Sequence, residues 1–166
     1  MRRLLRTPVW FYRCHCGRLL GHRFLLLTHI GRRSRLPRHT VLEVMIWDPE
    51  SREAIVMSGF GHTADWLRNI QVHPGPTVQI GSSHFIADHR ILGMEEAIAV
   101  VTNYERRHRF AAPLVRLVLS HLLGWRYRGT DADHARMAGQ LPLVAFRPRE
   151  PAAPAGIDAY PAVPIG

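Results

Sequence analysis

The feature that most constrains the fold is a series of short apolar runs separated by turn residues. The runs of strand length cover residues 24–30, 41–47, 54–58, 77–80, 84–92 and 141–146. Turn sequences, DPES at 48–51 and GSS at 81–83, join successive runs directly. Parallel strands need crossover connections of about a dozen residues or more, so these tight turns argue against a Rossmann sheet. We expect an α+β fold, mainly β, built as a small antiparallel barrel with peripheral helices.

Helical patterns lie between and after these runs. Residues 93–109 place apolar side chains on one stripe, with acidic residues in the first turn and basic residues in the last. Residues 113–123 form a second helix, with proline near its start and glycine after its end. A shorter helix is predicted to begin at Thr63, whose hydroxyl would cap it, and to end before Pro74.

The two ends of the chain differ in character from the middle. Within the N-terminal region 1–22, residues 7–20 read as a basic amphipathic helix, which suits either a membrane surface or, as we favour, one end of the barrel. From Pro148 the chain is rich in proline and alanine, so the predicted domain is 1–147 and the flexible tail 148–166. No apolar run reaches the length of a membrane span, and we expect a cytoplasmic protein, with membrane association left open. Cys14 and Cys16 suggest reduced thiols, and no metal site is predicted.

The charge of the chain is strongly positive and unevenly distributed. The net charge is +9, lysine is absent, and ten arginines precede Glu43, the first carboxylate. Arginine offers a planar, permanently charged fork that suits phosphate and carboxylate groups. Such a chain attracts nucleic acid, an anionic membrane or a phosphorylated small molecule, unless the charge only solvates one face.

The most informative stretch is LLLTHIGRRSRLPRHT at residues 25–40. It holds four arginines within seven residues and no carboxylate. In one turn between two strands these charges repel one another, and an anion at the centre would stabilise the turn. Gly31 lets the backbone approach closely, and Ser34 and Thr40 add hydroxyl groups.

Three motifs together resemble a known family. They are the pattern Thr-x-x-Gly-Arg-Arg-Ser-x-x-Pro-Arg-x-Thr at 28–40, Ser-Gly-x-Gly at 58–61 and Asp-Trp-x-x-Asn at 65–69. This combination resembles the deazaflavin (coenzyme F420)-dependent nitroreductase family from about residue 10 to residue 148. The resemblance implies a split β-barrel of the FMN-binding split-barrel type. It also implies an oxidoreductase that transfers a hydride from reduced F420 to an apolar acceptor, such as a quinone, a nitro compound or an activated alkene.

The resemblance also implies which residues hold the cofactor. The basic turn would bind its phosphate and acidic tail, the loop after the next strand would lie against the deazaflavin ring, and the inserted helix would follow. His62 stands where many members have a lysine and would take over its cationic role. The predicted cofactor-binding residues are Arg32, Arg33, Ser34, Arg38, Thr40, Met57, Ser58, Gly59, Gly61, His62, Trp66 and Asn69.

The residues that would carry the chemistry remain unidentified. F420 performs the hydride transfer itself, so the protein needs no catalytic triad or carboxylate pair. Tyr12, Tyr104 and Tyr127 are candidates for the acceptor pocket, and His29, His39 and His62 are candidates for protonating a reduced substrate.

Two other hypotheses about the function stay open. One is an FMN-dependent reductase of the same fold, and the other is a non-enzymatic cofactor carrier or basic anion-binding module. Aromatic residues do not alternate with the arginines of the basic cluster, so we do not expect nucleic-acid binding. A homodimer stays open.

Overall fold

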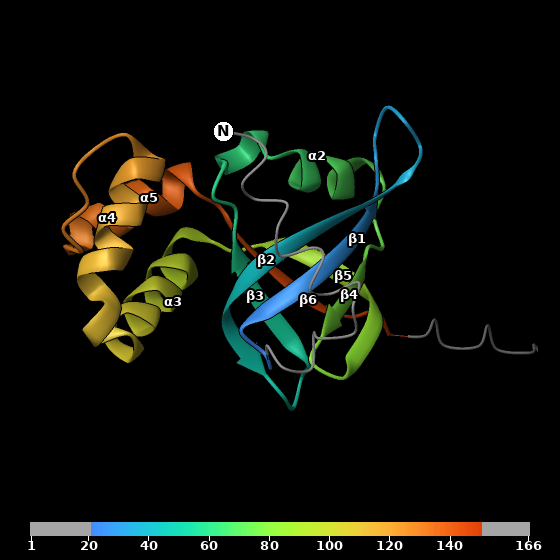
Figure 1. The fold of residues 1–166 in the computed structure, drawn as a ribbon, viewed down its shortest axis with the longest axis horizontal. Coiled ribbons are helices and arrows are strands. Elements are labelled where there is room, and N and C mark those ends of the chain that lie inside the picture. The colour runs from blue at the N-terminus through green and yellow to red at the C-terminus, as the bar shows by residue number, and fades with distance from the viewer. Residues whose placement is uncertain (1–20, 151–166) are drawn as a thin grey trace, which may run out of the picture.

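The fold is a six-stranded barrel with helices on its outside and across one end (Figure 1). In this computed structural model, the structure describes residues 21–150. The elements in chain order are β1 Phe24–Ile30, β2 Pro37–Asp48, β3 Glu53–Met57, α2 Asp65–Val72, β4 Thr77–Ile80, β5 Ser83–Ile91, α3 Met94–Arg107, α4 Ala112–Leu123, α5 Asp131–Gln140 and β6 Leu143–Pro148. Two short 3₁₀ helices, Gly61–Thr63 and Arg109–Ala111, precede α2 and α4.

The six strands close into one barrel in the order β1-β2-β3-β6-β5-β4, and every neighbouring pair is antiparallel. Hairpins account for β1–β2, β2–β3 and β4–β5. The other three pairings, β1–β4, β3–β6 and β5–β6, join strands that are far apart in the sequence. The predicted antiparallel barrel with peripheral helices is therefore confirmed.

Two apolar clusters lie on the two sides of the barrel wall. One fills the interior and is covered at one end by α2; it includes Leu27, Val56, Ile70 and Phe146. The other lies outside β2, β3 and β6, beneath α3, α4 and α5. Both faces of β3 and β6 are thus buried, which is why these strands are continuous apolar runs rather than alternating ones.

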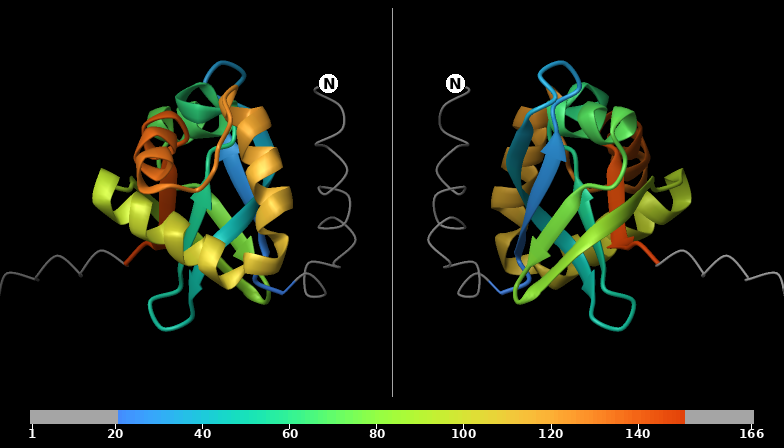
Figure 2. Two further views of the ribbon diagram at one scale, coloured as in Figure 1. Left: turned by 90° about the vertical axis from the view of Figure 1, so that its left-hand side faces the viewer. Right: turned by 90° about the vertical axis from the view of Figure 1, so that its right-hand side faces the viewer.

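Helices α3, α4 and α5 gather on one side of the barrel in Figure 1, and the left view of Figure 2 turns this side toward the viewer. Helix α5 was not predicted; it begins at a Thr130 capping box and buries His134 and Met137. Thr63 does not cap α2 as predicted, because its hydroxyl donates to the Phe60 carbonyl within the preceding 3₁₀ turn, and Ala64 stands at the cap position.

The ends of the described chain bear on two further expectations. β6 includes Pro148, the first residue of the predicted tail, and the backbone N–H of Arg149 donates to the Ile86 carbonyl. The predicted helix at 7–20 lies outside the described residues. No helix within residues 21–150 has the length and apolar character that a membrane span requires.

Candidate functional site

The loop between β1 and β2 is a compact, self-bonded turn. The Gly31 N–H donates to the Leu36 carbonyl at 2.9 Å, and the Arg35 N–H donates to the Gly31 carbonyl at 2.8 Å. A Cβ at position 31 would lie only 2.5 Å from the Ser34 hydroxyl oxygen, so a larger residue there would displace the Ser34 side chain. Arg35 reverses the chain in a left-handed conformation, with φ of 57°.

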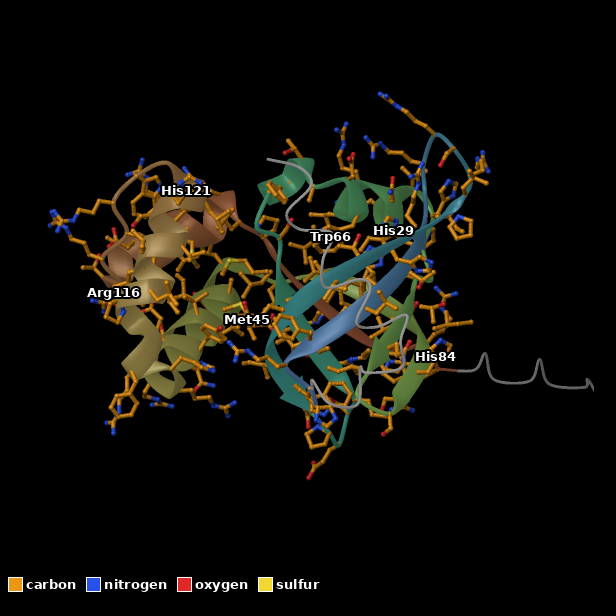
Figure 3. All side chains as sticks on the ribbon, in the orientation of Figure 1. His29, Met45, Trp66, His84, Arg116 and His121 are labelled. Carbon is orange, nitrogen blue, oxygen red and sulfur yellow. The ribbon has the colours of Figure 1, made fainter. Side chains whose placement is uncertain are left out.

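Beside this loop lies a cavity of about 480 Å³, which we call the basic pocket. Figure 3 shows His29 from β1 and Trp66 from α2 approaching each other at this end of the barrel. The basic pocket is lined by His29, Gly31, Arg32, Arg33, Ser34, Arg38, His39, Thr40, Asp65, Trp66 and Asn69. Seven of the twelve predicted cofactor-binding residues therefore meet around one cavity.

The arginines of the turn have different surroundings. Arg32 is held by the protein itself: its Nη1 donates to Asp65 Oδ1 at 2.9 Å and to Asn69 Oδ1 at 3.1 Å. Arg33 and Arg38 are exposed, and within residues 21–150 neither forms an ion pair. The sequence suggested a turn with no carboxylate nearby, but the fold brings Asp65 to it from α2.

His29 lies buried on the floor of the basic pocket, with 4% of its surface exposed. Burial, with smaller contributions from the nearby His39 and Arg38, lowers the pKa of His29 to about 4 against the opposing effect of Asp65. The ring is therefore neutral near pH 7. Both ring nitrogens are already engaged, one by Asn69 and one by Thr40, so His29 is poorly suited to protonating a substrate.

The turn after β3 carries the remaining predicted residues. Ser58 is buried and donates through its hydroxyl to the Gly61 carbonyl at 2.8 Å. Gly61 has φ of +63°, and a Cβ there would lie 2.8 Å from the Gln140 carbonyl oxygen. His62 is exposed and lines neither the basic pocket nor the neighbouring cleft.

That neighbouring cleft, of about 340 Å³, lies between the barrel wall and helices α3 and α4; we call it the apolar cleft. Figure 3 shows Met45 at its barrel side. Its lining is mostly aliphatic and includes Met57 and Gly59 from the predicted set. The apolar cleft is lined by Arg23, Glu43, Met45, Met57, Gly59, Val101, Tyr104, Glu105, His108, Leu114, Val115, Val118, Leu119 and Leu122.

A polar edge runs along one side of the apolar cleft. The Tyr104 hydroxyl donates to Glu43 Oε1 at 3.0 Å, and the His108 and Tyr104 rings lie 4.3 Å apart. Burial and the Glu43 carboxylate raise the pKa of Tyr104 to about 12, which keeps its hydroxyl protonated at neutral pH. Tyr104 was a predicted pocket tyrosine, whereas nothing in the sequence singled out Glu43 as its partner.

The other two candidate tyrosines do not join this edge. Tyr127 is buried and donates to Glu105, and burial together with that carboxylate raises its pKa. The hydroxyl of Tyr127 is thus already bonded to Glu105 of α3. Tyr12 lies outside the described residues.

Comparison with known proteins identifies the family. A family model described as F420H(2)-dependent quinone reductase matches residues 4–108, which is more than half of the chain. The chain belongs to this family. The resemblance drawn from the motifs is therefore confirmed at the level of a deazaflavin-dependent oxidoreductase family. No curated protein has a significant match to the sequence.

Solved structures share the fold of this quinone reductase family member at low sequence identity. A protein of unknown function from Agrobacterium tumefaciens has 14% identity and a TM-score of 0.51, over 83% of this chain and 54% of that one. A putative pyridoxamine 5'-phosphate oxidase from Listeria innocua has 11% identity and a TM-score of 0.50, over 85% and 94%. An F420-H2 dependent reductase has 16% identity and a TM-score of 0.44, over 76% and 96%. The two likenesses with TM-scores of 0.50 and 0.51 concern the fold alone, and this chain spans about half of the Agrobacterium protein.

The basic pocket has the chemistry that the cofactor of a quinone reductase of this family requires. F420 is acidic, since it carries a phosphodiester and a glutamate tail. The pocket offers two exposed guanidinium groups, on Arg33 and Arg38, and the hydroxyls of Ser34 and Thr40. Guanidinium forks and hydroxyl donors are the groups that bind phosphate and carboxylate oxygens. The donor set therefore fits the acidic part of F420.

Proposed function

We propose that this protein is an F420H2-dependent reductase that uses the basic pocket for the acidic part of the cofactor and the apolar cleft for a quinone-like acceptor. The observation that carries the proposal is the course of β2. This strand contributes Thr40 to the basic pocket and, a few residues later, Glu43 and Met45 to the apolar cleft. One strand thus joins an anion-binding cavity to an apolar one.

Within this proposal the residues divide into two groups. Arg33, Arg38 and Ser34 bind the phosphate and the glutamate tail, and Met57, Ser58 and Gly59 support the deazaflavin ring at the end of β3. Arg32 acts as a support for the loop rather than as a direct ligand, because Asp65 and Asn69 already hold it. When bound, F420H2 supplies the hydride.

The apolar cleft suits the acceptor that the family name specifies. Its aliphatic wall would exclude water from a flat apolar acceptor, and the burial of apolar surface would favour binding of that acceptor. On one edge the Tyr104 hydroxyl donates to Glu43, whose carboxylate can only accept. To orient an acceptor oxygen, this hydroxyl would turn from Glu43 and donate to that oxygen instead. Nitro compounds and activated alkenes are other acceptors of the same apolar class.

The test of cofactor binding is a fluorescence titration with F420, with FMN and NADPH in parallel. We expect F420 to bind at micromolar affinity or better. Arg33→Ala and Arg38→Ala should each weaken it by about tenfold or more, because a hydrogen bond to a charged group contributes about 1.5–3 kcal/mol. Arg126→Ala is the matched control, since Arg126 is an exposed arginine of another cavity.

Two results would replace the proposal with one of its alternatives. Tight binding of FMN without binding of F420 would indicate a flavin enzyme of the same fold. Binding of F420 without oxidation of F420H2 by a soluble quinone, menadione, would indicate a cofactor carrier.

A further inference from the structure

The buried amide of Asn69 has only one orientation that satisfies its neighbours. Two donors point at its Oδ1, the backbone N–H of Arg32 at 3.0 Å and the Arg32 Nη1 at 3.1 Å. Turning the amide over would set its NH₂ group against both donors. The oxygen of Asn69 therefore faces Arg32, and its nitrogen faces the barrel end.

This orientation determines which nitrogen of His29 carries the proton. Asn69 Nδ2 lies 3.1 Å from His29 Nδ1, and an amide nitrogen can only donate. His29 Nδ1 must then be the unprotonated acceptor. Since the buried ring is neutral, its single proton lies on Nε2.

The same reasoning reaches Thr40. His29 Nε2 lies 3.2 Å from the Thr40 hydroxyl oxygen, so the N–H donates and the oxygen accepts. The hydroxyl proton of Thr40 is not used in that bond. Thr40 lines the basic pocket, so its proton remains available to a group inside the pocket.

We infer that His29 is a positioning residue that makes Thr40 an obligatory hydrogen-bond donor to the ligand of the basic pocket. The relay runs from Arg32 through Asn69 and His29 to Thr40, and each of its hydrogen bonds pairs a donor with an acceptor. The group that meets Thr40 must therefore be an acceptor without a competing donor, as a phosphodiester or carboxylate oxygen is. The inference rests on the proposed function for the identity of that ligand, F420, but the relay itself belongs to the protein alone.

The relay can be tested without any cofactor. In the full-length, ¹⁵N-labelled protein at pH 7, a two-bond ¹H–¹⁵N spectrum distinguishes the two tautomers and the charged imidazolium. We expect His29 to have a protonated Nε2 and an unprotonated Nδ1, with its signals assigned by their loss in His29→Gln. A His29 with a proton on Nδ1, or on both nitrogens, would overturn the inference whether or not F420 binds.

The effect on the ligand is tested by variants of Thr40. Thr40→Val should weaken the binding of F420 by about tenfold. Thr40→Ser keeps the hydroxyl, and its dissociation constant for F420 should stay within about twofold of the unmodified protein's. In a His29→Leu background the hydroxyl is no longer directed, so the cost of Thr40→Val should fall below about threefold. Thr102→Val is the matched control, because Thr102 also bonds a buried histidine, His134, but on the other side of the molecule.

The outcomes separate the inference from the proposed function. If F420 binds and Thr40→Val costs the same with and without His29, the relay does not direct the hydroxyl and the inference fails. If F420 does not bind at all, the proposed function fails, and the tautomer of His29 alone decides the relay.

Discussion

At the residue scale, the basic pocket shows how one buried histidine can organise charged neighbours without being charged itself. Arg32 is 20% exposed at its side chain and is fixed by Asp65 and Asn69, whereas Arg33 and Arg38 remain exposed. A protonated His29 would present a second donor to Asn69 and break this arrangement. This set of hydrogen bonds around the loop therefore needs a neutral His29, which the lowered pKa provides at neutral pH.

The same lowered pKa predicts how stability depends on pH. Between about pH 4 and 6.5, His29 takes up a proton in the unfolded chain but not in the folded one. The free energy of unfolding should therefore fall as the pH drops through this window, by up to about 1.4 kcal/mol per pH unit from this group, and the contribution levels off below pH 4. His29→Leu should lose this part of the slope.

The measurement is urea unfolding of the protein and of His29→Leu at several pH values from 7 to 4. The two proteins share every titrating group except His29, so the difference between their free energies of unfolding isolates the contribution of this residue. Parallel curves for the two proteins would show that His29 titrates normally and would contradict the expectation.

At the scale of elements, local signals account for the strands but not for everything between them. The apolar runs and turn sequences predicted β1 and the hairpins, because adjacent strands and their turn are encoded together. Helix α5 was missed because its apolar stripe is weak, although Thr130 and Asp133 form a capping box. Thr63 was assigned as a cap because the additional 3₁₀ turn cannot be foreseen from residue types.

The capping box of α5 gives a prediction about stability. The Thr130 hydroxyl accepts from the Asp133 N–H at 3.2 Å, and the Asp133 carboxylate accepts from the Arg128 and Thr130 N–H groups. Thr130→Ala should lower the free energy of unfolding by about 1 kcal/mol, whereas Thr130→Ser, which keeps a capping hydroxyl, should not lower it. Urea unfolding of both variants measures this, and equal losses would mean that the hydroxyl does not cap the helix.

At the scale of the whole molecule, the candidate site is assembled from contacts that no local pattern encodes. The motifs predicted the basic turn, and closure of the barrel brings it to Asn69, which is 37 residues from Arg32. Glu43 and Tyr104, 61 residues apart, meet only because α3 packs against β2. The residues of the basic turn that line one cavity could therefore be found from the sequence, although their binding of an anion stays a prediction, whereas the polar edge of the apolar cleft could not be found.

This division into two cavities predicts that cofactor binding and acceptor reduction can be separated by mutation. Tyr104 lines the apolar cleft and does not line the basic pocket. Tyr104→Phe should leave the dissociation constant of F420 within about twofold, because no contact of the basic pocket changes and the phenylalanine ring keeps the shape of the cleft beside Met57 and Gly59. It should lower kcat/KM for menadione by about tenfold, since one oriented hydrogen bond to the acceptor is worth about 1.4 kcal/mol in the transition state.

Arg38→Ala should show the reverse pattern, with weakened F420 binding and an acceptor KM that is unchanged when F420H2 saturates the enzyme. Fluorescence titration and steady-state oxidation of F420H2 measure both quantities, and a loss of F420 affinity in Tyr104→Phe would mean that the two cavities act as a single site.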